Sequence, residues 1–462
     1  MLPSLVKHLI YPFHERLLSR PTFSRLAELE NSQWLNREEL ENLQLERLGT
    51  LLKSALLHCP WHAGRLRGAG LDLPEIAALG WDDFRRLPTM GKADAKRHGD
   101  EIVWHGVPGG TYRYTTGGSS GEPLIFHFGK TRQAADQAGR IRSRRWWGVD
   151  VGDREVYLWG APVELNKTDR IKTLRDRLFN QRVLNAFEMS PGRMDEYLAS
   201  ISAFRPSCLY GYASSLALLA AHGRARGVPL RLPCLKVVCT TGEPLYPHQR
   251  QLIGEYFGVP VANEFGSRDV GFTAHETPDG EMLLFSEGIV LEVLDPQGRP
   301  VAPGEAGEAV MTGLNSEAQP FIRYRTGDMV RLSPNPGTSG RGLHVIEEVI
   351  GRQTDFLVKA DGTVMHALAA IYILRGVAGV GEFRVIQHTT RHVEVEIVTG
   401  ESWRPEAKPE IVRQFRQRLG EAVTVTIREV EGILPEASGK YRYVVSHVPL
   451  PSALQEASRQ TS

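Results

Sequence analysis

The sequence predicts an α/β protein. We expect a large N-terminal α/β domain with a β-rich subdomain, followed by a small, mobile α+β C-terminal domain. The 462 residues suffice for roughly two to four domains of about 150 residues each. A hydrophobic fraction of 41% and a charged fraction of 24% are ordinary for globular proteins and exclude general disorder. From Tyr112 onward, short apolar runs alternate with helix-like segments, which is the pattern of a mostly parallel sheet.

Residues 1–105 are expected to form a helical region packed on the large domain. Between Asn36 and Leu52 apolar residues recur at helical intervals among charged ones. Residues 106–350 are expected to form the core. Its predicted parallel strands are 155–159, 235–240 and 260–263, and its predicted helices are 195–204, 214–226 and 247–257. The strands expected in the β-rich subdomain are 288–295, 307–312 and 328–332.

Residues 351–450 are expected to form the small C-terminal domain, and residues 451–462 a polar tail. Alternating apolar and polar residues predict half-exposed strands in this domain. The expected strands are 382–387, 392–398 and 423–428, and the expected helices are 366–374 and 406–419.

Charge and cysteine content exclude several classes of protein. The chain has 55 Lys and Arg against 54 Asp and Glu, so its formal net charge of +1 gives no global attraction for nucleic acid or an anionic membrane. The four cysteines fit no zinc-site spacing and are too few for a disulfide-rich secreted scaffold. The N-terminus does not resemble a signal peptide, and no uncharged run is long enough to span a bilayer. We expect a cytoplasmic monomer or homodimer without membrane insertion and without nucleic acid as a partner.

A loop rich in glycine and hydroxyl groups, Thr115–Pro123, suits a polyphosphate. Its glycines allow the backbone to approach a ligand closely, and its successive N–H groups can form an anion-binding nest. It does not follow the GxxxxGK[ST] pattern, which excludes the usual P-loop NTPase. A flexible Gly/Ser turn is the alternative interpretation.

Three further segments carry charged residues that could contact a nucleotide or coenzyme A. In Pro320–Asp328, Asp328 could accept hydrogen bonds from ribose hydroxyls, and Arg323 and Arg325 could pair with phosphate or with carboxylates. A charged hairpin is the alternative there. Lys440 follows a glycine in a late loop, where a solvated charge is the ordinary interpretation. The arginine-rich run 140–145 could attract the phosphates of coenzyme A, but a solvated helix face is favoured.

Taken in order, these segments resemble the adenylate-forming superfamily of acyl-CoA synthetases, and specifically its phenylacetate–CoA ligase-like branch, which includes capsule-biosynthesis relatives. The likeness runs from the helical N-terminal region to Lys440. TGGSSGEP resembles the family's phosphate loop, and Thr240–Pro244 resembles its nucleotide-base loop. Asn263–Asp269 resembles the motif whose aromatic residue lies against adenine and whose acid holds magnesium. RYRTGD matches the ribose-binding motif, Gly351-Arg352 the start of the interdomain hinge, and Ser438–Lys440 the catalytic-lysine loop.

The resemblance implies a role for individual residues. Lys440 would bridge the carboxylate and the α-phosphate, and Asp269 would be catalytic through Mg²⁺. The implied nucleotide-binding residues are Thr115, Thr116, Gly117, Gly118, Ser119, Ser120, Gly121, Gly242, Glu243, Pro244, Glu264, Phe265, Gly266, Ser267, Asp328 and Arg352. The implied acyl-site residues are Trp159, Tyr210, Gly211 and Tyr212, and the implied hinge residues are Thr354 and Asp355.

Three positions depart from the family's pattern. Asp269 stands where most relatives have Glu, so its carboxylate reaches one methylene less far. Thr354, followed by Asp355, stands where the hinge usually has an acid or Lys. Glu122 replaces the Lys that many relatives have near the end of the phosphate loop, which exchanges a cation for an anion close to the expected phosphates.

The resemblance implies a two-step reaction. A carboxylic acid, aromatic or arylacetic on the strength of the branch alone, would attack ATP to give an acyl-adenylate and would then be transferred to CoA. ATP, Mg²⁺ and CoA are the implied cofactors and acceptor, and the small domain would rotate between the two half-reactions. The alternatives are transfer to an amine, transfer to an unknown acceptor in polysaccharide biosynthesis, and a non-catalytic nucleotide-binding protein.

Overall fold

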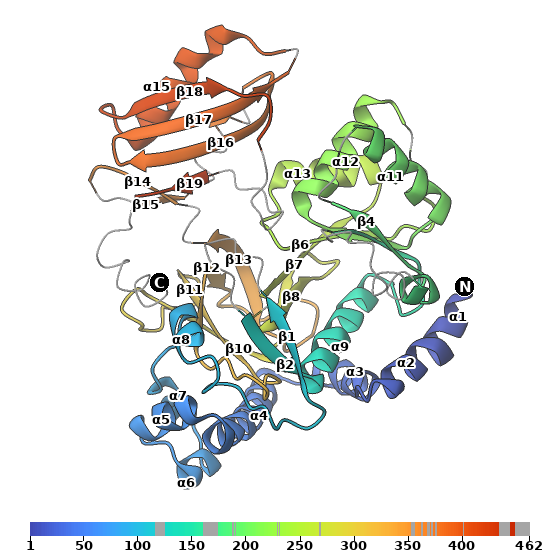
Figure 1. The fold of residues 1–462 in the computed structure, drawn as a ribbon, viewed down its shortest axis with the longest axis vertical. Coiled ribbons are helices and arrows are strands. Elements are labelled where there is room, and N and C mark those ends of the chain that lie inside the picture. The colour runs from blue at the N-terminus through green and yellow to red at the C-terminus, as the bar shows by residue number, and fades with distance from the viewer. Residues whose placement is uncertain are drawn as a thin grey trace.

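The protein is a mixed α/β structure, which confirms the fold class that the sequence predicts (Figure 1). The computed structural model describes residues 1–115, 125–159, 174–186, 189, 191–228, 230, 232–267, 269–352, 356–361, 364–366, 370, 373–374, 377–400, 402–433 and 444–448. None of the helices within these ranges is both long enough and apolar enough to cross a membrane.

Helices fill most of the first hundred residues. They are α1 (Pro3–Leu5), the π-helix η1 (Val6–Ile10), α2 (Tyr11–Leu17), α3 (Thr22–Ser32), α4 (Arg37–His58), α5 (Pro60–Gly68), α6 (Leu73–Ala77), α7 (Trp81–Arg85) and α8 (Lys92–Arg97). Helix α4 begins with a capping box, in which Asn36 and Glu39 each accept the other's backbone N–H at 2.9 Å. Leu48 and Leu52 of α4 share one hydrophobic cluster with Val290 and Ile322, so this region packs on the strands that follow.

The strands 155–159 to 345–352 form one sheet in the order β10-β11-β12-β13-β9-β8-β7-β6-β5-β3-β4. The parallel half consists of β3 (Glu155–Trp159), β4 (Gln181–Asn185), β5 (Cys208–Gly211), β6 (Val237–Thr241) and β7 (Val261–Ser267). The antiparallel half consists of β8 (Gly271–Glu276), β9 (Met282–Leu284), β10 (Ile289–Leu294), β11 (Ala306–Gly313), β12 (Tyr324–Leu332) and β13 (Val345–Arg352). The expected β-rich stretch is therefore an extension of the parallel sheet, joined to it where β7 pairs with β8.

Four longer helices and a hairpin complete the large body. The helices are α9 (Lys130–Trp146), α11 (Pro191–Phe204), α12 (Ala213–Ala225) and α13 (Pro247–Phe257), and the hairpin is β1 (Thr111–Thr115) with β2 (Ile125–Gly129). In Figure 1, α11, α12 and α13 lie together beside the parallel strands, and their leucines share a core with Val156 and Val238. Helix α9 packs against β8, because Gly139 leaves room for the ring of Phe272; a Cβ there would lie 2.8 Å from that ring.

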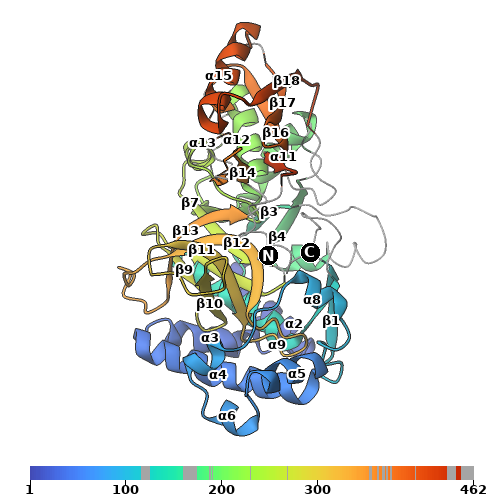
Figure 2. The same cartoon turned by 90° about the vertical axis from the view of Figure 1, so that its left-hand side faces the viewer.

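The C-terminal part has a sheet of its own. It contains β14 (Phe356–Val358), β15 (Val364–His366), β16 (Val380–Thr389), β17 (His392–Thr399), α15 (Lys408–Leu419), β18 (Thr424–Glu429) and β19 (Val444–Ser446). Four of these strands form a sheet in the order β18-β17-β16-β19, and Phe415 of α15 packs on it. The helix expected at 366–374 is wrong at its start, since His366 is the last residue of β15. Figures 1 and 2 show this part at one end of the molecule, apart from the large body.

Candidate active site

The expected acyl-site and base-site residues meet at the carboxyl ends of the parallel strands. Trp159 ends β3, Gly211 ends β5, and Gly242 follows β6. The register places Leu158 beside Gly211, Gly211 beside Thr240, and Thr241 beside Glu264. Segments that lie about 100 residues apart in the sequence thus form one continuous edge, which is where open α/β sheets bind ligands.

Three aromatic rings form a wall at this edge. The ring of Trp159 stacks on Tyr212 with centroids 4.5 Å apart and on Tyr210 at 5.7 Å. Tyr210 and Tyr212 are buried, and Trp159 is half-buried. Stacked, buried rings offer a flat apolar surface of the kind that lines small-molecule sites.

Two glycines are required for this wall. A Cβ on Gly211 would lie 2.5 Å from the carbonyl oxygen of Leu158, so only glycine lets β5 approach β3 here. Gly242 has a φ of +79°, and a Cβ on it would lie 3.1 Å from the ring of Tyr212. The loop Gly242-Glu243-Pro244 can follow this course because its first residue has no side chain.

Glu264 lies behind the wall. Glu264 is 4% exposed, and the hydroxyl of Tyr210 donates a hydrogen bond to its Oε1 at 2.7 Å. Arg140 Nε of α9 lies 3.6 Å from the same oxygen. Burial alone would raise the pKa of Glu264, but Arg140, with smaller contributions from His275 and Arg144, holds the pKa below its usual value. The Glu264 carboxylate is therefore ionised and accepts the hydrogen bond from Tyr210. Because Glu264 is buried, the neighbouring Phe265 is the better candidate for contact with a nucleotide.

Phe265, Gly266 and Ser267 occupy the end of β7, where its pairing with β8 is irregular. The register shifts between Phe265 and Gly266, so a bulge lies at this point. Phe265 is half-buried against the main core, and Gly266 is exposed. Bulges of this kind commonly redirect side chains next to active sites.

Asp269 is joined directly to the RYRTGD segment. The hydroxyl of Tyr324 donates to Asp269 Oδ2 at 2.8 Å, and Arg132 Nη1 of α9 donates to the Asp269 carbonyl oxygen at 2.6 Å. Two segments that the sequence treats as separate motifs therefore share one hydrogen bond. That bond fixes the direction of the Asp269 carboxylate.

The two arginines of RYRTGD pair with carboxylates, which settles the choice that the sequence left open. Arg323 donates to Glu292 through Nε at 2.9 Å and Nη2 at 2.8 Å, and Arg325 Nε donates to Glu308 at 2.8 Å. Both arginines are buried. Arg323 also has a φ of +53° and donates to the carbonyl oxygens of Arg85, at 2.5 Å, and Leu87. These two side chains hold the start of β12 in place.

Asp328 and Arg352 are brought opposite each other. They are paired Cα partners in the ladder between β12 and β13. Asp328 is 8% exposed, and Gly327 before it has a φ of +74°. The two residues expected at the ribose thus lie on neighbouring strands, as one ligand would require.

The hairpin that carries the expected phosphate loop reaches the same region. Thr115 pairs with Ile125 at the end of the hairpin from which the expected phosphate loop continues. The Arg132 guanidinium lies over the rings of Phe126 and Phe128 of β2, at 5.6 and 5.4 Å, while it also holds the carbonyl of Asp269. Phe126 contacts Phe321 at 6.4 Å, and Phe321 contacts Tyr324 at 4.9 Å. The part of the hairpin next to the expected phosphate loop therefore lies beside Asp269 and the RYRTGD segment.

Several expected residues lie outside the described part of the chain. They are Thr116, Gly117, Gly118, Ser119, Ser120, Gly121, Glu122, Thr354, Asp355 and Lys440. Their neighbours are described: the hairpin strands flank the phosphate loop, β13 ends just before the hinge, and β19 begins four residues after Lys440.

The arginine-rich run 140–145 on α9 is not the solvated helix face that the sequence favours. Arg142 is 1% exposed and pairs with the buried Glu287 at 2.5 Å. Arg144 is buried, pairs with Glu155 and lies over the Tyr210 ring at 4.8 Å. Only tertiary packing provides these partners, because the carboxylates come from β3 and from the segment before β10.

Sequence reasoning missed three residues that connect the site: Arg132, Arg140 and Tyr324. Arg132 and Arg140 lie on α9, eight residues apart, and contact the segments around Asp269 and Glu264. Tyr324 lies inside the RYRTGD motif, but the sequence alone does not indicate a hydrogen-bond partner for its hydroxyl. The spacing of Arg132 and Arg140 on one helix is the signal that could have suggested a shared face.

Comparisons with known proteins agree with this geometry. The sequence profile of the CapK C-terminal domain matches residues 357–447. Protein CapK from Staphylococcus aureus is 21% identical over 374 residues, covering 79% of this chain and 81% of that protein. Phenylacetate–coenzyme A ligase from Pseudomonas putida is 25% identical over 342 residues, covering 72% of this chain and 75% of that enzyme. The chain is therefore similar in sequence to CapK and to phenylacetate–coenzyme A ligases.

The fold of the chain agrees with that of a solved ligase over nearly its whole length. A crystal structure of 2-hydroxyisobutyryl-CoA ligase in the postadenylation state, in complex with R3-HIB-AMP, superimposes with a TM-score of 0.71. The two chains are 20% identical, and the match covers 93% of this chain and 94% of the other. The same ligase in its thioesterification state gives a TM-score of 0.58 at equal coverage.

Proposed function

We propose that the chain is an AMP-forming acid–thiol ligase, which activates a carboxylic acid with ATP and passes the acyl group to coenzyme A. The single observation that carries this proposal is the hydrogen bond from the Tyr324 hydroxyl to Asp269 Oδ2, which joins two of the expected nucleotide-binding motifs. The aromatic wall at Trp159 and the Asp328–Arg352 strand pair support it. Sequence likeness to phenylacetate–coenzyme A ligases over about 70% of the chain supports the same reaction.

Each residue has a task in the first half-reaction. Phe265 lies against adenine, and Asp328 and Arg352 hold the ribose. The hydroxyl and amide groups of the phosphate loop, with Thr115 at its start, hold the β- and γ-phosphates. The stack of Trp159, Tyr210 and Tyr212 forms a wall for an aromatic or arylacetic acid, which contacts it at the half-buried Trp159. Lys440 would act between the carboxylate and the α-phosphate, where negative charge develops as pyrophosphate leaves.

Asp269 suits a magnesium ion in the way that ATP-using enzymes need. No group of three or more His, Cys, Asp or Glu residues that could enclose a metal occurs in the described ranges. One oriented carboxylate is nevertheless sufficient, because Mg²⁺ at such sites keeps several waters and is shared with substrate phosphates. Bound there, the ion would neutralise phosphate charge; the chain's own contribution is the Tyr324 hydroxyl, which holds Asp269 in position.

Rotation of the C-terminal part would separate the two half-reactions. A solved ligase of similar fold occurs in a postadenylation state and in a thioesterification state, and this chain superimposes on them with different TM-scores, which supports such a rotation. Tyr246, which follows the base loop, packs against the core of the C-terminal part and provides a contact that such a rotation would change.

The decisive experiment is acid-dependent exchange of labelled pyrophosphate into ATP, measured with a panel of aryl, arylacetic and short aliphatic acids. We expect exchange with at least one acid, and a thioester when CoA is added without an amine. Exchange followed by amide formation only would replace CoA with an amine as acceptor. Absence of exchange with every acid, from a protein that still binds ATP, would support the non-catalytic alternative.

Lys440→Ala tests the first half-reaction separately. We expect acid-dependent exchange to fall by about 100-fold or more while the unfolding temperature is unchanged, because the lysine stabilises charge only in the transition state. Lys408→Ala, in the same C-terminal part and paired with Glu429 at 2.7 Å, is the matched control and should retain exchange. Equal rates in Lys440→Ala and wild type would contradict the assigned role.

A second acceptor class has one observation in its favour. The profile match to the CapK C-terminal domain covers residues 357–447, and this part would form one side of the acceptor channel after rotation. An acceptor from polysaccharide biosynthesis is therefore the second candidate. Formation of acyl-adenylate with no thioester and no amide would favour it.

A further inference from the structure

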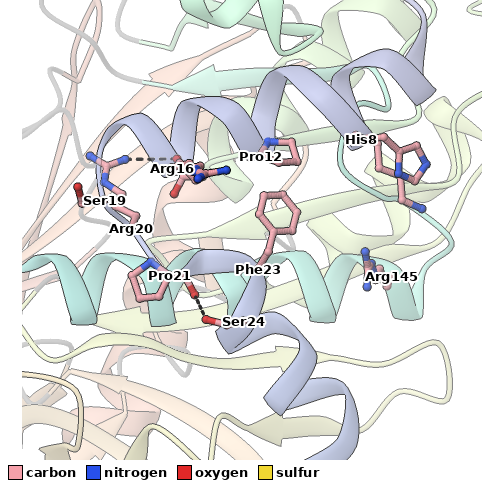
Figure 3. Close-up of a pocket in the computed structure, with 11 residues that line it drawn as sticks. His8, Pro12, Arg16, Ser19, Arg20, Pro21, Phe23, Ser24 and Arg145 are labelled. Atoms are coloured by element: carbon pink, nitrogen blue, oxygen red, sulfur yellow. Dashed lines mark hydrogen bonds and ion pairs between the residues drawn. The ribbon is translucent and has the colours of Figure 1, made fainter.

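The helical N-terminal region has two parts with different contacts. Elements η1, α2 and α3 line a cavity of about 830 Å³ together with Arg145 of α9 (Figure 3). Lys7 and Arg145 both pair with Asp150 at 2.8 Å, and none of these residues is among those expected at the nucleotide. The second part runs from α5 to α8 and includes residues 88–91, which we call the strap. It contacts the RYRTGD segment directly.

The strap pairs with the start of β12. Met90 N–H donates to the Arg323 carbonyl oxygen at 2.9 Å, and Arg325 N–H donates to the Met90 carbonyl oxygen at 2.9 Å. These bonds make a parallel bridge between Met90 and Tyr324, because they go to the two residues that flank Tyr324. Within the described ranges β12 pairs with β13 from Asp328 onward, so at Tyr324 the strap occupies the edge of β12 that β13 leaves open.

Two side chains of α5 hold the residues just before Tyr324. His62 Nε2 donates to the Pro320 carbonyl oxygen at 2.8 Å, and Arg65 Nη2 donates to the Ile322 carbonyl oxygen at 3.4 Å. Burial lowers the pKa of His62 to about 3, so the ring is neutral and its Nδ1 accepts from Arg65 Nη1 at 3.0 Å. The two side chains lie three residues apart on one helix face and act together.

Arg65 also joins the strap to this pair of side chains. Its Nη2 donates to the carbonyl oxygen of Pro88, the first residue of the strap, and its guanidinium lies over the ring of Trp61 at 4.6 Å. Arg65 thus contacts both segments that meet at Tyr324, the strap through Pro88 and β12 through the preceding Ile322. A planar guanidinium with five N–H donors can serve several acceptors in this way.

These contacts supply direction as well as attachment. Apolar packing already attaches the region, since Leu48 shares a hydrophobic cluster with Ile322, but hydrophobic burial is not directional. Hydrogen bonds are directional. Those from α5 and the strap engage successive backbone groups, namely the carbonyls of Pro320, Ile322 and Arg323 and the N–H of Arg325.

We propose that Arg65 and the strap are positioning elements of the candidate active site, which fix Tyr324 and through it the Asp269 carboxylate. The Tyr324 hydroxyl donates to Asp269 Oδ2 at 2.8 Å, and the direction of a side chain follows from its backbone. Contacts on both sides of Tyr324 therefore also hold its hydroxyl. The inference rests on the proposed function, in which the Asp269 carboxylate binds the metal of the nucleotide complex.

A double-mutant cycle between Arg65 and Tyr324 tests the proposal. Binding of the Mn²⁺ complex of ATP to the full-length protein, followed by electron paramagnetic resonance without any acid, reports on the carboxylate without turnover. We expect Arg65→Gln to weaken this binding about fivefold. In a Tyr324→Phe background the same substitution should change binding by less than about twofold, because Arg65 acts through the hydroxyl that is then missing.

Hydrogen exchange of the protein alone is a second measurement, which needs neither metal nor nucleotide. Arg65→Gln should speed amide exchange at least about threefold in peptides that span residues 320–328, because the bond from Arg325 N–H to the strap opens more often. If Arg65→Gln does not fold, Arg65→Lys gives the same comparison with smaller changes, since lysine keeps the charge but lacks the guanidinium fork.

Arg47→Gln is the matched control. Arg47 of α4 also donates to a backbone carbonyl, that of Glu287 at 2.7 Å, but it has no printed role in the RYRTGD segment. This variant should keep wild-type binding and wild-type exchange in 320–328, whatever its unfolding temperature. Equal weakening by Arg65→Gln in both backgrounds, or unchanged exchange in 320–328, would overturn the positioning role. Failure of the proposed function is distinct: wild type would show no acid-dependent pyrophosphate exchange, while the Arg65 effects would persist.

Discussion

The two halves of the central sheet contribute to the candidate site in opposite ways. In the parallel half, motif side chains themselves form the surface, as Trp159 and Tyr212 do. In the antiparallel half, the arginines of RYRTGD are turned inward to Glu292 and Glu308, and Tyr324 and Asp328 remain at the site. Parallel strands end together at an edge that is already shaped for a ligand. The start of β12, where its register against β11 shifts, is shaped instead by buried ion pairs.

The largest effect should come from breaking one of those ion pairs. Arg325→Ala leaves Glu308, which is 3% exposed, as an uncompensated buried charge, and we expect a loss of about 3–5 kcal/mol in unfolding free energy. Chemical denaturation measures it. Arg331→Ala, on the same strand but in a solvent-exposed pair with Glu348, is the control and should change stability by less than about 1 kcal/mol. Similar losses in both variants would show that the start of β12 is not held by the buried pair.

The next effect concerns catalysis and not stability. Asp269→Asn keeps the size of the side chain and can still meet the Tyr324 hydroxyl, but it removes the charge proposed to bind Mg²⁺. We expect acid-dependent exchange to fall by about 100-fold, with little change in unfolding temperature. Raising the Mg²⁺ concentration should restore part of the rate. An Asn variant with the wild-type rate and wild-type Mg²⁺ dependence would remove Asp269 from the site.

A smaller effect should follow when the support of Asp269 is removed. Tyr324→Phe deletes the hydroxyl that donates to Asp269 at 2.8 Å and keeps the ring against Phe321. Groups that orient a metal ligand typically change affinity or activity by 10-fold or more, and we expect about a tenfold higher Mg²⁺ requirement. The titration of exchange rate against Mg²⁺ distinguishes this from a change in acid binding, which should not occur.

The smallest effect is a pH dependence in the parallel half. Burial disfavours the charged form of Glu264, whereas Arg140 favours it, and the pKa of Glu264 is lowered on balance. The ionised carboxylate therefore stabilises the fold at any pH above its unfolded pKa. That stability is lost as the pH falls through the folded pKa. Arg140→Gln removes the favourable cation. The stability difference from wild type should therefore be largest near pH 7 and shrink as Glu264 protonates on acidification. Denaturation from about pH 4 to 7 measures it.

A second substitution makes that comparison specific. In a Glu264→Gln background there is no carboxylate to titrate at this position, so adding Arg140→Gln should give a stability difference that is independent of pH. If the difference still varies with pH, another acid near Arg140, such as Asp136 on the same helix, is responsible.

Local sequence predicted much of the secondary structure and the order of the motifs. The strand Glu155–Trp159 and the helix Pro247–Phe257 have the predicted bounds, because each is a short periodic segment bounded by turn residues. The convergence of Trp159, Tyr210, Gly242 and Phe265 could be expected only from the family resemblance. Their assigned roles stay predictions, as do those of Lys440 and the hinge residues.

By itself, the sequence determined which segments form strands and helices and which motifs it carries, since both depend on neighbouring residues and on local backbone preferences. Tertiary structure alone decided which charges are buried and which apolar groups are exposed. The arginine-rich α9 and the leucine-rich first helix illustrate this in opposite directions: Arg142 is inside and Leu9 is outside. An arginine can be satisfied by water or by a carboxylate from a distant strand, and a leucine stripe can face a core or a partner. Packing between segments far apart in the chain makes that choice.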